Sequence, residues 1–183
     1  IDAGVKEFIF IISKKKLSIK KYFFNDNFYI KILKKKKDKI LLFLGRLEPE
    51  KGIRELIEAW EQLIKDSKKN GWWLLVVGYG SMSDYVKSKA ISDRRIIFHG
   101  KSIGEEKEFI LRMSKAFILP SLSEGIPIAV LEALSNKLLC LLTKECNFNK
   151  LDKLGSSIEI KKDTQHIKHS LKRLFNSLYN ASI

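Results

Sequence analysis

Cysteine and long apolar runs, on which disulfide-linked and membrane-spanning proteins depend, are scarce in this chain. It has two cysteines among 183 residues: Cys140 lies in an apolar stretch and Cys146 follows it. We predict two free thiols in a reducing compartment, which would make the chain cytoplasmic. The apolar run FIFII, residues 8–12, is five residues long and is followed by lysines. That is too short for a membrane-spanning helix, which needs about 20 apolar residues.

Signatures of metal and dinucleotide sites are weak as well. His99 ends an apolar stretch, while His166 and His169 are three residues apart with no cysteine or acidic cluster beside them. We interpret the histidine pair as part of a solvated helix face rather than a metal site. The run VGYGSM, residues 77–82, lacks the third glycine of a dinucleotide-binding fingerprint, so a nicotinamide enzyme is not favoured.

Charge is scarce in one segment of this otherwise charge-rich chain. The 21 residues from Ala116 to Asn136 contain two charged side chains, Glu124 and Glu132, where the chain-wide share of 31% predicts about six. Such a segment is typical of an interior, where carboxylates are rarely buried without a partner. Two interpretations stay open from these residues alone. Either the glutamates bind a ligand, or Glu132 pairs with a lysine or arginine to close the core while Glu124 is a solvated loop residue.

The same segment is predicted to form a strand, a loop and a buried helix. AFILP ends at Pro120, SLSEG is typical of a turn, and Pro127 suits the first turn of a helix. The backbone N–H groups of Gly125, Ile126 and Ile128 would be free at the helix start, with no acidic residue in the first turn. That arrangement favours a phosphate.

The spacing of the two glutamates fits a nucleotide laid across this helix start. Glu132 lies five residues beyond Pro127, roughly 7.5 Å along a helix axis. That is about the distance from a diphosphate to the ribose of the same nucleotide. Glu124 falls on the opposite side of the helix start. A ligand ordered as sugar, diphosphate and ribose would meet Glu124, the helix start and Glu132 in turn.

A second cluster follows an apolar stretch that begins at Ile40 and ends at Gly45. A turn containing Arg46 and Lys51 comes next, and then an amphipathic helix. The apolar positions of that helix share one face: Ile53, Leu56, Ile57, Trp60, Leu63 and Ile64. Arg46 and Lys51 therefore stand past the carboxyl end of a buried parallel strand, where open α/β sheets bind ligands. Two cations there suit a diphosphate.

Short apolar stretches and helical patterns alternate along the rest of the chain. Strands are predicted at 72–77, 95–100, 116–120, 138–143 and 157–161, and helices at 53–68, 82–90, 105–114, 126–135 and 164–179. The alternation predicts an α/β fold, a Rossmann-like parallel sheet with helices on both faces. The length has room for one such domain, which we place at 40–183, after an N-terminal segment and basic linker at 1–39.

Four motifs stand out in order along the chain: GRLEPEKG at 45–52, VVGYG at 76–80, FHG at 98–100 and LPSLSEGIPIAVLEAL at 119–134. On these motifs, the chain from about residue 40 to 179 resembles the donor-binding domain of retaining glycosyltransferases of the two-domain GT-B type, glycosyltransferase family 4, also called glycosyl transferases group 1. The last motif contains the family's E-x7-E pattern as Glu124 and Glu132. Each motif is weak alone, but their order and spacing together are specific.

The resemblance implies a catalytic set of three residues. Arg46 and Lys51, which follow Gly45, would hold the donor diphosphate and stabilise charge on the departing nucleotide. Glu124 would act beside the transferred sugar. The reaction of this family keeps the anomeric configuration and usually needs no metal at the donor. The chain fits this pattern, because it has no Asp-x-Asp pair to hold a metal on a diphosphate, so we expect neither a metal nor another cofactor.

The resemblance also implies the remaining donor-binding residues. The backbone from Gly125 to Pro127 would touch sugar and phosphate, and Glu132 would accept hydrogen bonds from the ribose hydroxyls. Gly100 and Lys101 would line the base. One departure from the family is that LSNKLLCLLT, residues 134–143, lacks the glycine and proline often found there. We therefore expect the turn at 135–138 to be built differently.

The implied function is the donor-binding half of a retaining, metal-independent glycosyltransferase. It would move a sugar from a nucleotide-diphosphate sugar to a lipid-linked or surface-glycan acceptor in polysaccharide biosynthesis. The family's N-terminal acceptor domain is missing from the chain, and residues 1–39 would be its tail. We therefore expect the chain to be inactive alone.

The net charge of +14 leaves an alternative function open. Much of the excess lies ahead of the domain, in lysines 14–16, 20, 21 and 34–37. We favour biased composition as the cause. The next explanation is attraction to anionic lipid, which would place the protein on the inner face of the membrane. Aromatic residues interleaved with lysines at 20–31 make nucleic acid the least favoured partner. The alternative is a noncatalytic basic module of the same fold that binds anionic lipid or nucleic acid.

Overall fold

The computed structural model describes residues 39–66, 71–125, 127–148 and 156–180. These residues fall within one compact unit, Lys39–Ile183. The predictions made for residues 1–38 lie outside the described ranges. Among the described helices, none combines the length and the apolar character needed to cross a bilayer.

Six parallel strands form one sheet in the order β3-β2-β1-β4-β5-β6. Their bounds are Lys39–Leu44 (β1), Trp72–Val77 (β2), Ile96–Gly100 (β3), Ala116–Leu119 (β4), Leu139–Thr143 (β5) and Ser157–Ile160 (β6). The central strands are continuous apolar runs with almost every residue buried, as expected of a sheet covered on both faces. The predicted Rossmann-like parallel sheet is confirmed.

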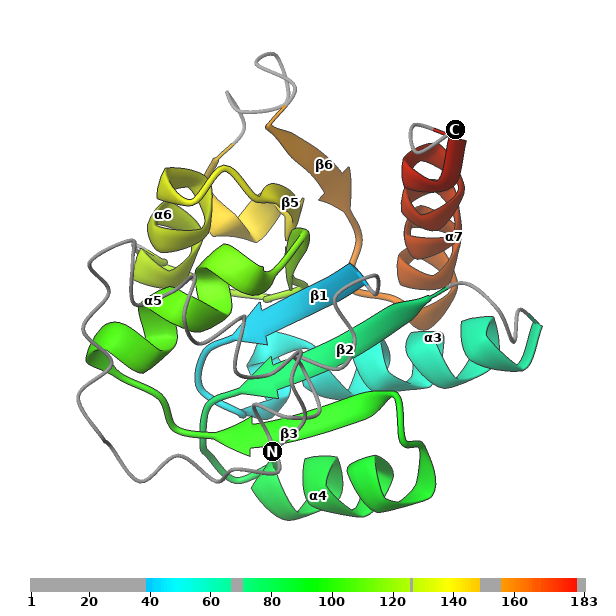
Figure 1. The fold of residues 1–183 in the computed structure, drawn as a ribbon, viewed down its shortest axis with the longest axis horizontal. Coiled ribbons are helices and arrows are strands. Elements are labelled where there is room, and N and C mark those ends of the chain that lie inside the picture. The colour runs from blue at the N-terminus through cyan, green and yellow to red at the C-terminus, as the bar shows by residue number, and fades with distance from the viewer. Residues whose placement is uncertain (1–38, 67–70, 126, 149–155, 181–183) are drawn as a thin grey trace, which may run out of the picture. The chain divides into compact units, whose positions relative to one another are not determined.

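Five helices of the described residues connect or follow these strands. They are Ile53–Asp66 (α3), Ser83–Ser92 (α4), Gly104–Met113 (α5), Ile128–Ser135 (α6) and Thr164–Asn180 (α7), with 3-10 turns at Pro49–Lys51 (η1) and Lys144–Cys146 (η2). Parallel crossovers are right-handed, so the reversal of strand order at β1 requires α3 and α4 to lie on one face and α5 and α6 on the other. Figure 1 shows α3 passing behind β1 and β2, with α5 and α6 gathered together.

The closing helix α7 packs onto α3 through an aromatic cluster. The ring of Phe175 stacks on Trp72 at 4.6 Å between centroids and meets Trp60 edge-on at 5.9 Å. Trp60 and Trp72 are fully buried and Phe175 is buried, so the cluster joins α7 to the core although Phe175 is far from both tryptophans in sequence.

At the two ends of α6, one local detail differs from the sequence-based predictions and one agrees with them. Pro127 is the residue that caps α6 rather than part of its first turn, and the helix begins at Ile128. The turn after α6 is indeed built without glycine or proline. Lys137 adopts the left-handed conformation there with φ 59°, and the Leu138 N–H bonds back to the Ala133 carbonyl at 3.0 Å. This is the pattern that glycine usually supplies at a helix end.

Candidate functional site

A cleft of about 280 Å³ opens where the strand order reverses between β1 and β4. Open α/β sheets bind ligands at this point, outside the carboxyl ends of the strands. The cleft is lined by the end of β1 and the loops after β1, β2 and β3, together with α5 and α6. The lining residues are Leu44, Gly45, Arg46, Val77, Gly78, Tyr79, Lys101, Ser102, Lys107, Ile128, Ala129 and Glu132.

Backbone hydrogen bonds fix the loops that form one wall. The Gly45 N–H donates to the Val77 carbonyl at 3.1 Å, and the Gly78 N–H donates to the Gly100 carbonyl at 2.8 Å. Gly78 has φ +146°, and a Cβ at this position would lie 1.8 Å from the Gly45 carbonyl oxygen. The glycine in VVGYG is therefore required because two backbones meet there.

The start of α6 contributes to the opposite wall. Its first two residues, Ile128 and Ala129, line the cleft, and its first turn holds no acidic residue. Its N-cap residue, Pro127, makes no side-chain cap hydrogen bond. The Val130 N–H is already bonded to the Pro127 carbonyl at 2.9 Å. The positive end of the helix dipole therefore faces the cleft without a compensating carboxylate of its own.

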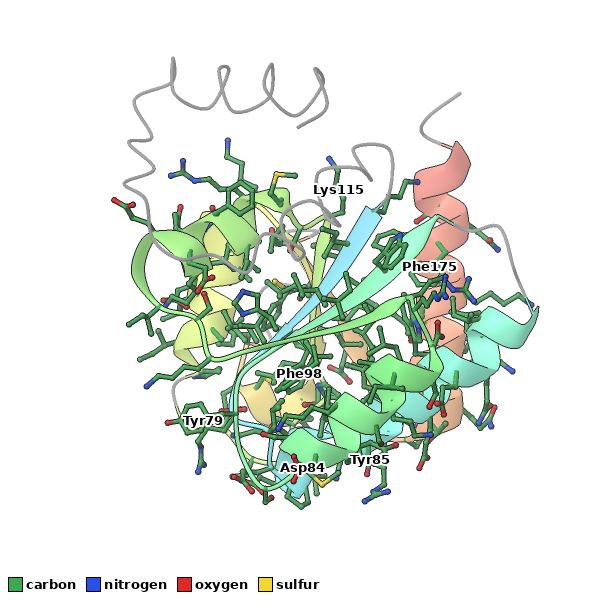
Figure 2. All side chains as sticks on the ribbon, turned by 60° about the horizontal axis from the view of Figure 1, so that its bottom comes forward. Tyr79, Asp84, Tyr85, Phe98, Lys115 and Phe175 are labelled. Carbon is green, nitrogen blue, oxygen red and sulfur yellow. The ribbon has the colours of Figure 1, made fainter. Side chains whose placement is uncertain are left out.

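Two cations stand at the wall formed by the strand-end loops. Arg46 has a side chain 64% exposed, and its guanidinium is 3.7 Å from Glu50. The ammonium of Lys101 lies over the ring of Tyr79, 5.3 Å from its centroid. Figure 2 shows Tyr79 projecting at the end of the sheet, and the residue is exposed. Weakly held surface cations of this kind can turn onto an anionic ligand.

The Glu132 carboxylate is paired within the cleft. The Lys107 ammonium, on α5, lies 2.5 Å from its Oε1, and each side chain is 29% exposed. Two interpretations of Glu132 were open from the sequence, a ligand-binding carboxylate or a pair with a lysine or arginine that closes the core. The structure shows the pair with a lysine. The pair does not close the core, because both side chains line an open cleft.

Glu124 is also paired, and more deeply. Its Oε1 lies 2.9 Å from the Lys51 ammonium, with side chains 12% and 11% exposed. Lys51 also donates to the Ser123 carbonyl at 3.2 Å, and the Asn147 side-chain amide donates to the Glu124 carbonyl at 3.1 Å. Glu124 is thus neither an unpartnered carboxylate nor a solvated loop residue. Lys51, expected to contact a diphosphate, is directed to Glu124 in this structure.

The cleft brings together only part of the predicted set. Four predicted residues line it: Gly45, Arg46, Lys101 and Glu132. Five described ones do not, namely Lys51, Gly100, Glu124, Gly125 and Pro127. Ile126 lies outside the described residues. The ligand-binding role of every one of these residues stays a prediction.

Several lining residues escaped the sequence analysis, above all Tyr79, Ser102 and Lys107. Ser102 donates to Glu106 Oε2 at 2.9 Å, and Glu106 Oε1 is 3.2 Å from His99 Nε2, so the end of β3 and the start of α5 are tied together. The VVGYG motif drew attention to the Tyr79 loop. Lys107 carries no comparable signal, because it is one of 35 basic residues.

Both cysteines are free, and both are buried. Burial raises the pKa of the Cys140 thiol to about 12, and it raises the pKa of Cys146 as well. Such thiols are poor nucleophiles and metal ligands near neutral pH. Within the described ranges, no group of three histidine, cysteine or acidic side chains is placed to hold a metal ion.

Comparisons with known proteins agree with this fold. The sequence profile of the family described as "Glycosyl transferases group 1" matches residues 25–177. A curated relative from Escherichia coli, UDP-Gal:alpha-D-GlcNAc-diphosphoundecaprenol alpha-1,3-galactosyltransferase, is 31% identical over 106 residues. That match covers 57% of this chain and 27% of the relative, so this chain corresponds to about a quarter of that protein.

Solved structures share the fold. The C-terminal domain of the glycosyl transferase group 1 family protein LpcC from Francisella tularensis matches with a TM-score of 0.64 and 24% identity, covering 80% of this chain and 81% of that one. WaaG, a glycosyltransferase involved in lipopolysaccharide biosynthesis, matches with a TM-score of 0.66 and 18% identity, covering 85% of this chain and 43% of that one.

Proposed function

This chain belongs to the family of glycosyl transferases group 1, and from that premise we propose that its cleft binds a nucleoside-diphosphate sugar. The longer protein then transfers the sugar, with retention of configuration and without a metal, to a lipid-linked or surface-glycan acceptor. The galactosyltransferase relative supports this proposal, because its name gives a UDP-sugar as donor and a diphosphoundecaprenol-linked sugar as acceptor. An N-terminal acceptor domain completes the cleft in this proposal.

The observation that carries the proposal is the charge arrangement of the cleft. Arg46, Lys101 and Lys107 line it together with the uncapped start of α6, and Glu132 is the one carboxylate among the lining residues. Cations and a helix N-terminus stabilise a bound diphosphate, while a carboxylate accepts hydrogen bonds from ribose hydroxyls. Cationic side chains also supply the charge stabilisation that a metal gives in other glycosyltransferases.

The sugar end of the donor lies toward Glu124 in this proposal. The Lys51 ammonium holds that carboxylate in place through the ion pair with Glu124 Oε1, 2.9 Å long. Glu124 then acts beside the transferred sugar, while Arg46 holds the diphosphate as the leaving group gains charge. Lys51 acts through Glu124 and is a positioning residue.

Nucleotide binding tests the proposal directly. The chain is titrated with UDP, GDP and ADP in EDTA, and thermal unfolding and calorimetry report binding. We expect one of the three to stabilise the fold by about 2.7 kcal/mol at a hundredfold excess over Kd. Arg46→Gln should weaken binding of that nucleoside diphosphate more than binding of the matching nucleoside, because the nucleoside lacks the phosphate charge that Arg46 contacts in this proposal.

Two other outcomes count against it. Binding that requires Mg²⁺ would remove the metal-independent part of the proposal. No response to any nucleotide, together with salt-sensitive binding to DNA or to vesicles of anionic lipid, would favour the alternative of a noncatalytic basic module.

A further inference from the structure

Lys107 holds an unusual position in the cleft. It belongs to the first turn of α5, which also contains Glu105 and Glu106. The helix dipole disfavours a cation at that end, so helix stability does not account for a lysine there. Its ammonium instead reaches across to α6 and meets Glu132 Oε1 at 2.5 Å, inside the cleft.

We propose that Lys107 and Glu132 form a joint hydroxyl-binding pair, in which Lys107 is a specificity-determining residue that selects ribose over deoxyribose. The inference rests on the proposed function, because it assumes that a nucleotide occupies the cleft. It goes beyond that function by giving Lys107 the donor half of ribose recognition.

The hydrogen-bonding capacity of the two side chains supports the pairing. A lysine ammonium has three N–H donors, and the contact with Glu132 uses one of them. Among the described residues, Lys107 alone bonds to the Glu132 carboxylate, through Oε1. The Oε2 atom of Glu132 and two N–H donors of Lys107 are therefore left for a ligand. A hydroxyl group both donates and accepts, and it can therefore bond to Glu132 and Lys107 at once. Replacing it by hydrogen removes both of these bonds, and the two ions then keep only their contact with each other and with water.

The exposure of the pair argues against a purely structural role. Each side chain is 29% exposed, whereas the Lys51–Glu124 pair is 11% and 12% exposed. Partly exposed ion pairs contribute little to stability, so the contact can open to admit a hydroxyl at low cost. Partial exposure also limits the preference for ribose over deoxyribose, since water can replace some of the hydrogen bonds that a deoxyribose ligand does not make.

The test compares ribose and deoxyribose ligands in matched variants. The full chain is titrated with UDP, GDP and ADP and with the 2′-deoxy and 3′-deoxy form of whichever binds. We expect the ribose form to bind about tenfold more tightly than at least one deoxy form. Lys107→Met removes the donors at similar side-chain length and should reduce this preference to below about threefold, while Lys107→Arg keeps donors and should restore much of it.

Lys101→Met is the matched control, because it removes a lysine from the same cleft that stacks over Tyr79 rather than contacting Glu132. We expect Lys101→Met to weaken the binding of ribose and deoxyribose ligands equally, because it removes positive charge from the cleft without changing the contacts of Glu132. An unchanged preference in Lys107→Met would overturn the inference while leaving nucleotide binding intact. Tighter ribose binding in that variant would also overturn it, by showing that Lys107 merely competes for Glu132. Failure of the unaltered chain to bind any of the three nucleotides would instead reject the proposed function.

Discussion

The Lys51 ammonium lies 2.9 Å from the Glu124 carboxylate and joins the turn after β1 to the loop after β4. These loops leave the two strands between which the sheet reverses its order. A backbone hydrogen bond from the Leu122 N–H to the Glu50 carbonyl, 2.8 Å long, runs beside the ion pair. The pair therefore holds the Glu124 side chain against the turn after β1.

Removing one partner of this pair should destabilise the fold. The side chains are 11% and 12% exposed, so Lys51→Met leaves the Glu124 carboxylate nearly buried without its cation. We expect a loss of about 3 kcal/mol in the free energy of unfolding, since breaking a buried pair typically costs 3–5 kcal/mol. Urea unfolding followed by tryptophan fluorescence measures it.

The double variant Lys51→Met/Glu124→Leu provides the control. It removes both charges, and replacing a buried ion pair with apolar residues is often close to neutral. We expect it to recover more than half of the stability lost in Lys51→Met. A double variant that loses the sum of the two single losses would show that the two residues act independently.

The sequence predicted the framework of the site well but its ion pairs poorly. Strand and helix positions followed from hydrophobic periodicity, which is local, and the switch-point cleft followed from their alternation. The pairing of Lys51 with Glu124 joins residues 73 apart in sequence, and that of Lys107 with Glu132 joins residues 25 apart. With 35 basic residues in the chain, no local pattern indicates which of them meets a given carboxylate.

The turn after α6 offers a stabilising substitution. Lys137 adopts φ 59° there, a conformation in which a side chain crowds the backbone and glycine does not. Lys137→Gly should raise the free energy of unfolding by about 1 kcal/mol, because the left-handed conformation costs roughly that amount for other residues. Thermal or urea unfolding measures the change.

Lys144→Gly is the comparison for that substitution. Lys144 is an exposed lysine in η2, and its φ is not positive. Glycine there gains no relief of strain and increases the entropy of the unfolded chain, so stability should fall by up to about 1 kcal/mol. Equal effects of the two substitutions would contradict the role assigned to the Lys137 conformation.

Gly78 should tolerate no side chain. An alanine Cβ would lie 1.8 Å from the Gly45 carbonyl oxygen at a residue with φ +146°. Gly78→Ala should therefore cost at least about 3 kcal/mol, from overpacking and backbone strain together. Gly45→Ala is the matched control, because its Cβ would meet Phe43 at 4.0 Å, an ordinary contact. Similar unfolding midpoints for the two variants would contradict this account of the VVGYG motif.

The buried thiol of Cys140 should make stability depend on pH in the alkaline range. Burial raises its pKa in the folded chain to about 12, while an unfolded cysteine has a pKa of about 8.5. Between these values the folded state binds more protons than the unfolded state, so the free energy of unfolding falls as pH rises. The contribution is fully present below about pH 8.5 and is lost as the pH approaches the folded pKa.

Cys140→Ala isolates this contribution, because every other titrating group is common to the two proteins. Urea unfolding under reducing conditions should show that the unaltered chain loses about 1.6 kcal/mol more than the variant between about pH 8.5 and pH 10. Any constant loss from the missing sulfur shifts the variant's curve without changing its slope. Parallel curves would mean that the Cys140 thiol ionises in the folded chain as readily as in the unfolded one, and would contradict the raised pKa assigned to this buried residue of β5.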